Sequence, residues 1–147
     1  MSRFWIKPLL GAVALCLGTA GLGAQERTDL TIVVQNIKNA SGIVRLALWG
    51  GAEGFTVQEK ALVRLVQPAV AGALAFRFDG LKPGIYALAT YHDENGNSEM
   101  DRTWLGLPDE GLAFSNGAWI KFGPPSFEEA AFEVRPEPQV VTVSLRY

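Results

Sequence analysis

The stretch Ile43-Val44-Arg45-Leu46-Ala47-Leu48-Trp49 decides the fold class, because two kinds of position alternate along it. Successive side chains of a β-strand point to opposite faces of the sheet, so a strand with one buried face repeats every second residue. Val44, Leu46 and Leu48 form the uniformly apolar set, and we expect them to face the core. Trp49 belongs to the opposite set, and we expect it to face outward, where it would contribute to an interface.

Comparable short strands are predicted on both sides of this one. They cover residues 30–35, 73–78, 85–92, 131–134 and 140–145. Turns rich in Gly, Pro, Asn and Ser separate them, and the turn at 39–42 is predicted to join the first two strands as a hairpin. About seven short strands of this kind indicate an all-β protein, an antiparallel β-sandwich of immunoglobulin-like or transthyretin-like layout with one long loop and a short helix.

Two segments depart from the strand pattern. Residues 55–66 fit neither the strand period nor the helix period, so either a short helix or an irregular edge strand is expected there. Residues 102–130 carry Gly and Pro at intervals unsuited to a central strand and form the predicted long loop, with one further candidate strand at 118–122. Within this loop Ser126 is the predicted N-cap of the short helix. Long loops in compact domains are usually functional or held in place by something else.

The N-terminal residues have the composition of an export signal. Arg3 and Lys7 form a basic start, residues 9–17 are almost entirely apolar, and mostly small residues follow. We therefore predict a signal peptide over residues 1–24, one domain over residues 25–147, and a periplasmic or secreted location. The only cysteine, Cys16, lies within the predicted signal, so the mature chain would make no disulfide and no thiolate metal site.

The charge of the predicted mature chain disfavours two classes of partner. Removing Arg3 and Lys7 takes two from the 13 basic residues, against 15 acids, and leaves a net charge of about −4. No cluster of Lys or Arg stands out, so nucleic acid and anionic membrane are both poor partners. After cleavage of the signal, no second apolar segment is long enough to span a bilayer.

The acidic segment Asp93–Asp101 is the most distinctive polar feature. Four of its nine residues are acids, and oxygen-bearing side chains recur at every second position. Like charges this close repel unless a cation neutralises them or they point into water. A hard cation with six to eight oxygen ligands, such as calcium, would satisfy this spacing. The candidate metal ligands are Asp93, Asn95, Asn97 and Asp101 through their side chains, and Glu99 through its backbone carbonyl.

The spacing resembles the first part of an EF-hand or dockerin loop, with ligands at relative positions one, three, five, seven and nine. It departs from the EF-hand because Gly96 stands at position four, Ser98 replaces the Gly of position six, and Trp104 replaces the Glu of position twelve. Glu110 or Asp109 could return from the long loop to complete the set of ligands. Without such a ligand the expected Kd for calcium is on the order of 10⁻⁴ to 10⁻³ M.

The alternative for this segment is a solvated turn. Asn95-Gly96 is a strong signal for a two-residue hairpin turn of type I′. Acids on a solvated turn need no ion, although a turn alone does not call for oxygens at every second position.

His92 is the only histidine, and it immediately precedes the acidic segment. It could act as a general base with a nearby acid in a small hydrolase. The serines that would accompany it are Ser98, Ser115 and Ser126, and none lies in a Gly-x-Ser-x-Gly elbow. The simpler expectation is that His92 lies at the end of a strand and hydrogen-bonds the neighbouring loop.

Large aromatic residues gather in the long loop. They are Trp104, Phe114, Trp119, Phe122 and Phe127. If they are exposed they would stack on sugars or on a partner protein. If they are buried they would close the open end of the sandwich, which is the commoner fate of large aromatic residues.

Several of these segments together resemble a bacterial family of unknown function, family 2141. The matching segments are residues 84–89, 92–97, 101, 106–111, 115–116 and 123–127, and the most specific is His-Asp-Glu-Asn-Gly-Asn at 92–97. The resemblance covers nearly all of the predicted mature chain. It implies a secreted or periplasmic bacterial protein with a small β-sandwich, and it implies no particular activity.

These observations together favour a non-catalytic binding module whose loop is ordered by calcium. The predicted partner is a protein or a glycan of the cell envelope. The predicted binding residues are His92, Trp104, Glu110, Ser115 and Asn116. Two alternatives stay open: a small periplasmic hydrolase that uses His92 and a nearby acid, and a purely structural envelope protein whose loop holds no ion.

Overall fold

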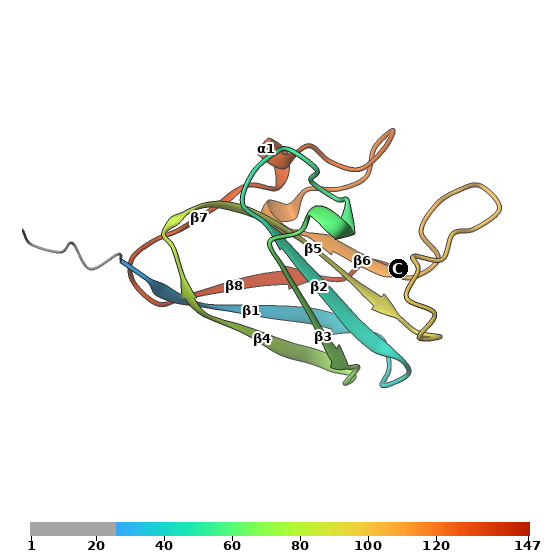
Figure 1. The fold of residues 1–147 in the computed structure, drawn as a ribbon. Coiled ribbons are helices and arrows are strands. Elements are labelled where there is room, and N and C mark those ends of the chain that lie inside the picture. The colour runs from blue at the N-terminus through green and yellow to red at the C-terminus, as the bar shows by residue number, and fades with distance from the viewer. Residues whose placement is uncertain (1–25) are drawn as a thin grey trace, which may run out of the picture.

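Two β-sheets share one hydrophobic core over residues 26–147, the part of the chain that this computed structural model describes (Figure 1). The predicted signal peptide lies outside the described residues. The strands are β1 (Thr28–Ile37), β2 (Ile43–Trp49), β3 (Val63–Pro68), β4 (Gly72–Leu81), β5 (Gly84–Asp93), β6 (Gly111–Phe114), β7 (Phe132–Val134) and β8 (Gln139–Ser144). The helices are short: η1 (Gln58–Lys60), η2 (Ser115–Gly117) and α1 (Phe127–Ala130).

The first sheet has three strands in the order β4-β1-β8, and the second has the order β3-β2-β5-β6, with β7 pairing to β5. This arrangement confirms the predicted all-β sandwich with a short helix. One pair differs from the antiparallel expectation, because β8 runs parallel to β1, from Leu30 beside Gln139 to Gln35 beside Ser144. The C-terminal strand therefore returns beside the N-terminal one.

The core between the sheets is built from the alternating apolar sets. Val44 and Leu48 are completely buried and Leu46 nearly so, as the sequence predicts. Leu30, Ile32 and Val34 of β1 face them from the other sheet. Burying a side chain of this size stabilises the fold by about 1.5 to 3 kcal/mol, so the period of two fixes which face of each strand turns inward.

The predicted hairpin between the first two strands is wrong. β1 pairs with β4 and β8, whereas β2 pairs with β3 and β5, so the turn after β1 crosses from one sheet to the other. Both strands carry an apolar face, and placing them in opposite sheets lets the two faces meet across the core. Gly42 in this turn has φ +67°, and a Cβ there would collide with the backbone carbonyl oxygens of Asp93 and Glu94.

The outward position predicted for Trp49 is also wrong, because only 1% of this residue is exposed. Its ring meets that of Phe55 edge to face, with 5.3 Å between the ring centroids. A second apolar cluster lies here on the outer face of the five-stranded sheet and includes Tyr91, Leu112 and Phe114. The segments around Phe55 and α1 cover that face, so alternation along β2 no longer separates core from solvent.

The two segments that depart from the strand pattern, residues 55–66 and 102–130, contain short helices and strands. Residues 55–66 hold both η1 and the start of β3, so both expectations for that segment are realised in part. The candidate strand at 118–122 is wrong, and the strand of the long loop is β6, whose four residues are all buried. Ser126 caps α1 as predicted, since its hydroxyl accepts from the Glu129 amide at 3.2 Å and the Glu129 carboxylate accepts from the Ser126 amide at 2.9 Å. Within residues 26–147, no helix is long and apolar enough to cross a membrane.

Candidate functional site

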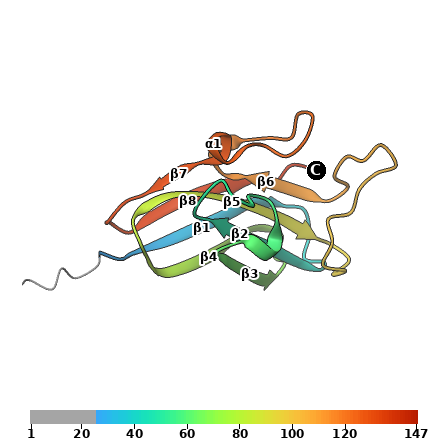
Figure 2. The same cartoon turned by 45° about the horizontal axis from the view of Figure 1, so that its top comes forward.

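The acidic loop, residues 93–101, begins where β5 ends, at one end of the five-stranded sheet (Figures 1 and 2). β5 pairs with β2 up to Ile43 beside Asp93, so the loop starts next to the turn that joins β1 to β2. The predicted type I′ hairpin turn at Asn95-Gly96 does not form, because β6 starts only at Gly111 and Asn95 does not have a positive φ. The chain instead makes a longer excursion.

Asp93 anchors the start of the acidic loop. Its side chain is completely buried, and one oxygen, Oδ2, accepts from Arg45 Nε at 2.8 Å and from the Ser98 amide at 2.9 Å. The other oxygen accepts from the Asn97 amide at 3.1 Å. Burial alone would raise the pKa of Asp93, but the hydrogen bonds from Arg45 and the loop amides outweigh it and lower the pKa below its ordinary value. Asp93 is therefore a fixed anion that organises the loop backbone.

Asn95, Asn97 and Asp101 converge at the exposed end of the loop. Asp101 accepts one hydrogen bond on each carboxylate oxygen, from Asn95 Nδ2 at 2.5 Å and from Asn97 Nδ2 at 3.0 Å. The side-chain oxygen of Asn95 accepts from the Asn97 amide at 3.0 Å, and that of Asn97 accepts from the Glu99 amide at 2.8 Å. Such local side-chain to backbone bonds shape compact turns. The residues at relative positions one, three, five and nine thus belong to one hydrogen-bonded cluster.

The backbone of this loop uses the left-handed conformation twice, at Gly96 and Ser98, both with φ 72°. Ser98 stands at the position where an EF-hand has Gly, and it adopts a conformation that favours Gly. Two contacts hold it there: its hydroxyl accepts from Arg45 Nη2 at 2.6 Å, and its carbonyl accepts from the Tyr91 hydroxyl at 3.2 Å.

Glu110 returns from the long loop to the acidic loop. Only 4% of it is exposed, and its two carboxylate oxygens accept from the backbone amides of Glu94 at 3.0 Å and Asp101 at 3.2 Å. Burial raises the pKa of Glu110, the two amide hydrogen bonds oppose this, and the charges of Asp93 and Asp101 add to the rise. Glu110 is thus a buried carboxylate surrounded by other negative charges, whereas Asp109 is exposed.

His92 supports the acidic loop from inside the fold. It is completely buried, with Nε2 2.7 Å from the Ser41 carbonyl and Nδ1 2.8 Å from the Tyr147 hydroxyl. A carbonyl only accepts, so Nε2 carries the proton and Nδ1 accepts from Tyr147. The Tyr147 hydroxyl in turn accepts from the Lys38 amide at 2.9 Å. His92 therefore bonds the turn between β1 and β2 and the side chain of Tyr147, whereas the simpler expectation was a bond to the loop that follows its own strand.

The serines proposed to accompany His92 make other contacts. Ser115 Oγ lies 2.9 Å from the Leu88 amide and 2.5 Å from the Ala130 carbonyl, and Ser126 caps α1. Neither of these two serines, nor Ser98, is among the polar contacts of the His92 ring within the described chain. The arrangement supplies no pair of nucleophile and base from these residues.

The remaining predicted binding residues lie away from the acidic cluster. Asn116 is exposed and donates from Nδ2 to the Glu129 carbonyl at 3.0 Å, so it joins η2 to α1. Trp104 is 92% exposed on the long loop. The structure therefore brings Glu110 to the acidic loop and leaves Ser115, Asn116 and Trp104 elsewhere.

Arg45 and Tyr147 are the residues of this site that sequence reasoning missed. A signal for Arg45 is present, because it is the only charged residue in β2, two positions from the residue that pairs with Asp93. No comparable signal marks Tyr147, since its contact with His92 depends on the parallel return of β8. The local periodicity of a sequence does not predict which distant strands will pair.

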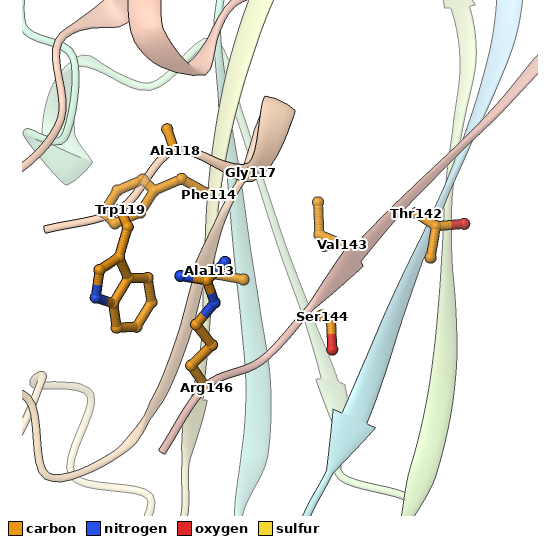
Figure 3. A pocket seen from close by; sticks show the side chains of 9 residues that line it. All are labelled: Ala113, Phe114, Gly117, Ala118, Trp119, Thr142, Val143, Ser144 and Arg146. Carbon is orange, nitrogen blue, oxygen red and sulfur yellow. The ribbon is translucent and has the colours of Figure 1, made fainter.

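Several hollows lie near this end of the molecule, among them one over the five-stranded sheet and one between the two sheets. One, of about 170 Å³, lies over the outer face of the five-stranded sheet and is bordered by Tyr91, Met100 and Ile120. The other, of about 150 Å³, lies where β6 and β8 diverge (Figure 3). There the Arg146 guanidinium stands 4.7 Å from the centroid of the Trp119 ring, a cation–π contact that closes one side.

The donor set fits a hard cation only if carboxamide oxygens take part. Within residues 26–147, no group of three or more Asp, Glu, His or Cys side chains is arranged to hold a metal ion. Asp93 and Asp101 supply carboxylates, and Asn95 and Asn97 supply neutral oxygens of the kind that calcium accepts. Both carboxamides now present their NH₂ groups to Asp101, so they would have to turn over to bind an ion.

The fold and the acidic loop together place the protein in the class of small β-sandwich domains that carry a candidate site on a loop at one end. The chain belongs to a bacterial family of unknown function, DUF2141, described as an uncharacterized protein conserved in bacteria, whose model matches residues 32–142. The match runs from β1 into β8, which confirms the resemblance seen in the sequence. Comparison with curated proteins and with solved structures finds no match.

Proposed function

We propose that the chain is an exported, non-catalytic binding module of the bacterial envelope whose acidic loop takes up a calcium ion. The observation that carries the proposal is the unbalanced charge around Asp101 and Glu110. Among residues 26–147, the ion pairs of the acidic loop itself join only Arg45 to Asp93 and Lys38 to Glu94. Asp101 and the buried Glu110 have amide donors but no basic partner, and their charges repel each other.

A cation at the exposed end of the loop would remove this repulsion. Its ligands would be the side chains of Asp101, Asn95 and Asn97, with Asp93 and the carbonyl of Glu99 completing the set. Calcium suits a flexible set of many oxygens better than magnesium, which prefers fewer protein ligands. Since the bidentate Glu of an EF-hand is missing, the expected Kd is on the order of 10⁻⁴ to 10⁻³ M, the range of extracellular calcium modules.

Ordering the acidic loop would also order the segment that follows it. The Asp101 carbonyl accepts from the Asp109 amide at 2.9 Å, and the Leu107 carbonyl accepts from the Thr103 amide at 2.8 Å. Residues 101–109 therefore form an excursion that these hydrogen bonds close, and it starts from the end of the acidic loop, which is its base. We propose that the ion fixes this base and so orders the excursion, and that the module binds a protein or a glycan of the cell envelope.

The test is a thermal melt of the mature protein in calcium and in chelator. At about 10 mM calcium the proposed Kd gives about 1.4 to 2.7 kcal/mol of added stability, because only the folded state holds the site. For a domain of this size that is a rise in Tm of roughly 5 to 10 °C. Asp101→Asn should remove the rise, whereas Glu53→Gln, at a remote acid with 96% of its side chain exposed, should keep it.

An unchanged Tm at this calcium concentration would contradict the proposal and favour an envelope protein whose acidic loop is only a solvated turn. A rise that Asp101→Asn leaves intact would place the ion elsewhere. The hydrolase alternative receives no support from the contacts of His92, whose two ring nitrogens are both engaged inside the fold.

A further inference from the structure

Two loops extend beyond the sheets at one end of the molecule, and both views show them (Figures 1 and 2). We call residues 102–108 and 119–125 the tip loops. They carry four strongly exposed large apolar side chains: Trp104 at 92%, Leu105 at 63%, Leu107 at 55% and Phe122 at 109%. Isolated exposed apolar residues are ordinary, but four on two loops are not.

The tip loops lie side by side. Arg102, Gly106 and Leu107 of the first loop and Lys121, Phe122 and Gly123 of the second line one shared hollow of about 270 Å³. A Cβ built at Gly106 or Gly123 would meet no atom within 4 Å, so both turns stand clear of the rest of the protein. Four exposed apolar side chains therefore lie on two adjacent loops, and Leu107 and Phe122 border the open hollow between them.

The two tip loops have matching compositions. Each contains one Trp, aliphatic residues, Gly and Pro, and each contains a single cation, Arg102 in the first and Lys121 in the second. Neither contains an acid, since the nearest acids flank the loops at Asp101, Asp109 and Glu128. Lys121 pairs with Glu129 at 2.9 Å, yet 72% of its side chain is exposed. Each tip loop thus carries one positive charge and no negative one, although acids flank both loops.

We propose that the tip loops dip into the surface of a phospholipid bilayer. Trp104, Leu105 and Phe122 would reach the boundary between headgroups and acyl chains, where Trp is favoured. Arg102 and Lys121 would face the lipid phosphates, and this placement of charge is the reason for choosing a bilayer. A fluid surface also accommodates protruding side chains, whereas a protein partner would need a matching concavity.

This inference goes beyond the proposed function and does not depend on calcium. It also refines the expectation from net charge, because each tip loop carries one cation and no acid. With one exposed aromatic side chain on each tip loop, the binding should be reversible and should weaken as salt screens the two cations.

The experiment is co-sedimentation of the mature protein with vesicles of phosphatidylcholine containing phosphatidylglycerol, and with phosphatidylcholine alone, both in chelator and low salt. The wild type should bind the first vesicles, and brominated lipids should quench a tryptophan whose signal disappears in Trp104→Phe. The double variant Trp104→Ser/Phe122→Ser should bind on the order of a hundredfold more weakly, because each of the two aromatic side chains contributes a factor of about ten when transferred from water. Arg102→Glu/Lys121→Glu should lose the preference for phosphatidylglycerol.

The matched control is Leu62→Ser, an equally exposed leucine at 60% that lies before β3, and it should bind like the wild type. All these positions are exposed, so circular dichroism and Tm should stay unchanged and exclude misfolding. The proposal is overturned if neither vesicle binds the protein, or if the double variant binds as well as the wild type. Lipid-free dimerisation that the double variant abolishes would assign the tip loops to a second copy and would also overturn it. Using chelator throughout keeps these outcomes separate from the calcium test.

Discussion

Two buried carboxylates, Asp93 and Glu110, hold the acidic loop through hydrogen bonds, and their pKa values are shifted in opposite directions. Asp93 gains more from Arg45 and the loop amides than burial removes, so its pKa is lowered. Glu110 has two amide donors and no basic partner, so burial and the neighbouring charges leave its pKa raised. The first residue stabilises the fold as an anion, whereas the second stabilises it more when protonated.

These opposite shifts predict two separate pH windows for stability. The raised pKa of Glu110 means that the folded state holds the proton more tightly than the unfolded state does. Its contribution is fully present below the ordinary Glu pKa of about 4.3 and is lost as pH rises through the raised value. The lowered pKa of Asp93 gives a contribution that is present above about 3.9 and is lost as pH falls through the folded value.

Urea unfolding of Glu110→Gln over a pH series checks the first window. In calcium-free buffer, the wild type should gain stability as pH falls from neutral toward about 4.5, and Glu110→Gln should lack that gain. Glu53→Gln, whose side chain is 96% exposed, should follow the wild-type profile. A Glu110→Gln profile that coincides with the wild type would show that Glu110 is not the titrating group.

At the scale of elements, the turn between β1 and β2 connects the two sheets and also supports the acidic loop. The Ser41 carbonyl is bonded by His92, Asn39 Nδ2 donates to the Glu94 carboxylate at 2.8 Å, and Gly42 lies against the backbone of Asp93. The end of β5 and the first residue of the loop are therefore placed by a turn about fifty residues earlier. A side chain at Gly42 would push these parts apart.

We therefore predict that Gly42→Ala destabilises the protein by about 3 kcal/mol or more, because the methyl group adds a backbone collision to the strain of a positive φ. The matched control is Gly96→Ala, whose φ is +72° and whose Cβ would meet nothing within 4 Å. That variant should cost only about 1 to 2 kcal/mol. Chemical denaturation measures both, and equal losses would show that the approach to Asp93 is not tight.

The strands whose one face is buried were predictable from the sequence, and the connections between them were not. The burial of Leu46 follows from the alternation of apolar residues along its own strand. The capping box at Ser126 likewise involves only residues close together in the sequence. The burial of Trp49 depends instead on the segment around Phe55 that covers it, and β6 has no alternation because all four of its residues are buried. Buried runs of this length carry no periodic signal.

The contacts of the candidate site also fall into those that the sequence predicts and those that it does not. The clustering of Asn95, Asn97 and Asp101 follows from their spacing along one loop, which the sequence displays. The return of Glu110 was one of two expectations for the long loop, and the pairing of Asp93 with Arg45 was not foreseen. Contacts within the loop were therefore accessible to sequence reasoning, while contacts from other elements depended on topology.

At the scale of the whole molecule, the last three residues of the chain connect the two sheets. The Leu145 amide donates to the Gln35 carbonyl at 2.9 Å in the three-stranded sheet. One residue later, Arg146 exchanges backbone hydrogen bonds with Leu112 of β6 at 2.9 and 3.0 Å. Tyr147 then completes the chain of hydrogen bonds to His92. The sandwich is closed at the end that carries the acidic loop, and it is closed by the C-terminal strand.

Removing residues 145–147 should consequently destabilise the molecule far more than their number suggests. Leu145 is 1% exposed, and losing a buried leucine side chain costs about 2 to 5 kcal/mol. Losing the Tyr147 hydroxyl leaves the buried Nδ1 of His92 without a donor, at a further cost of about 1 to 3 kcal/mol. Tyr147→Phe isolates this second effect and should cost only about 1 to 3 kcal/mol in urea unfolding. If the truncated chain lost no more stability than Tyr147→Phe, the closure by Leu145 and Arg146 would contribute little, and the two sheets would hold together through their shared core alone.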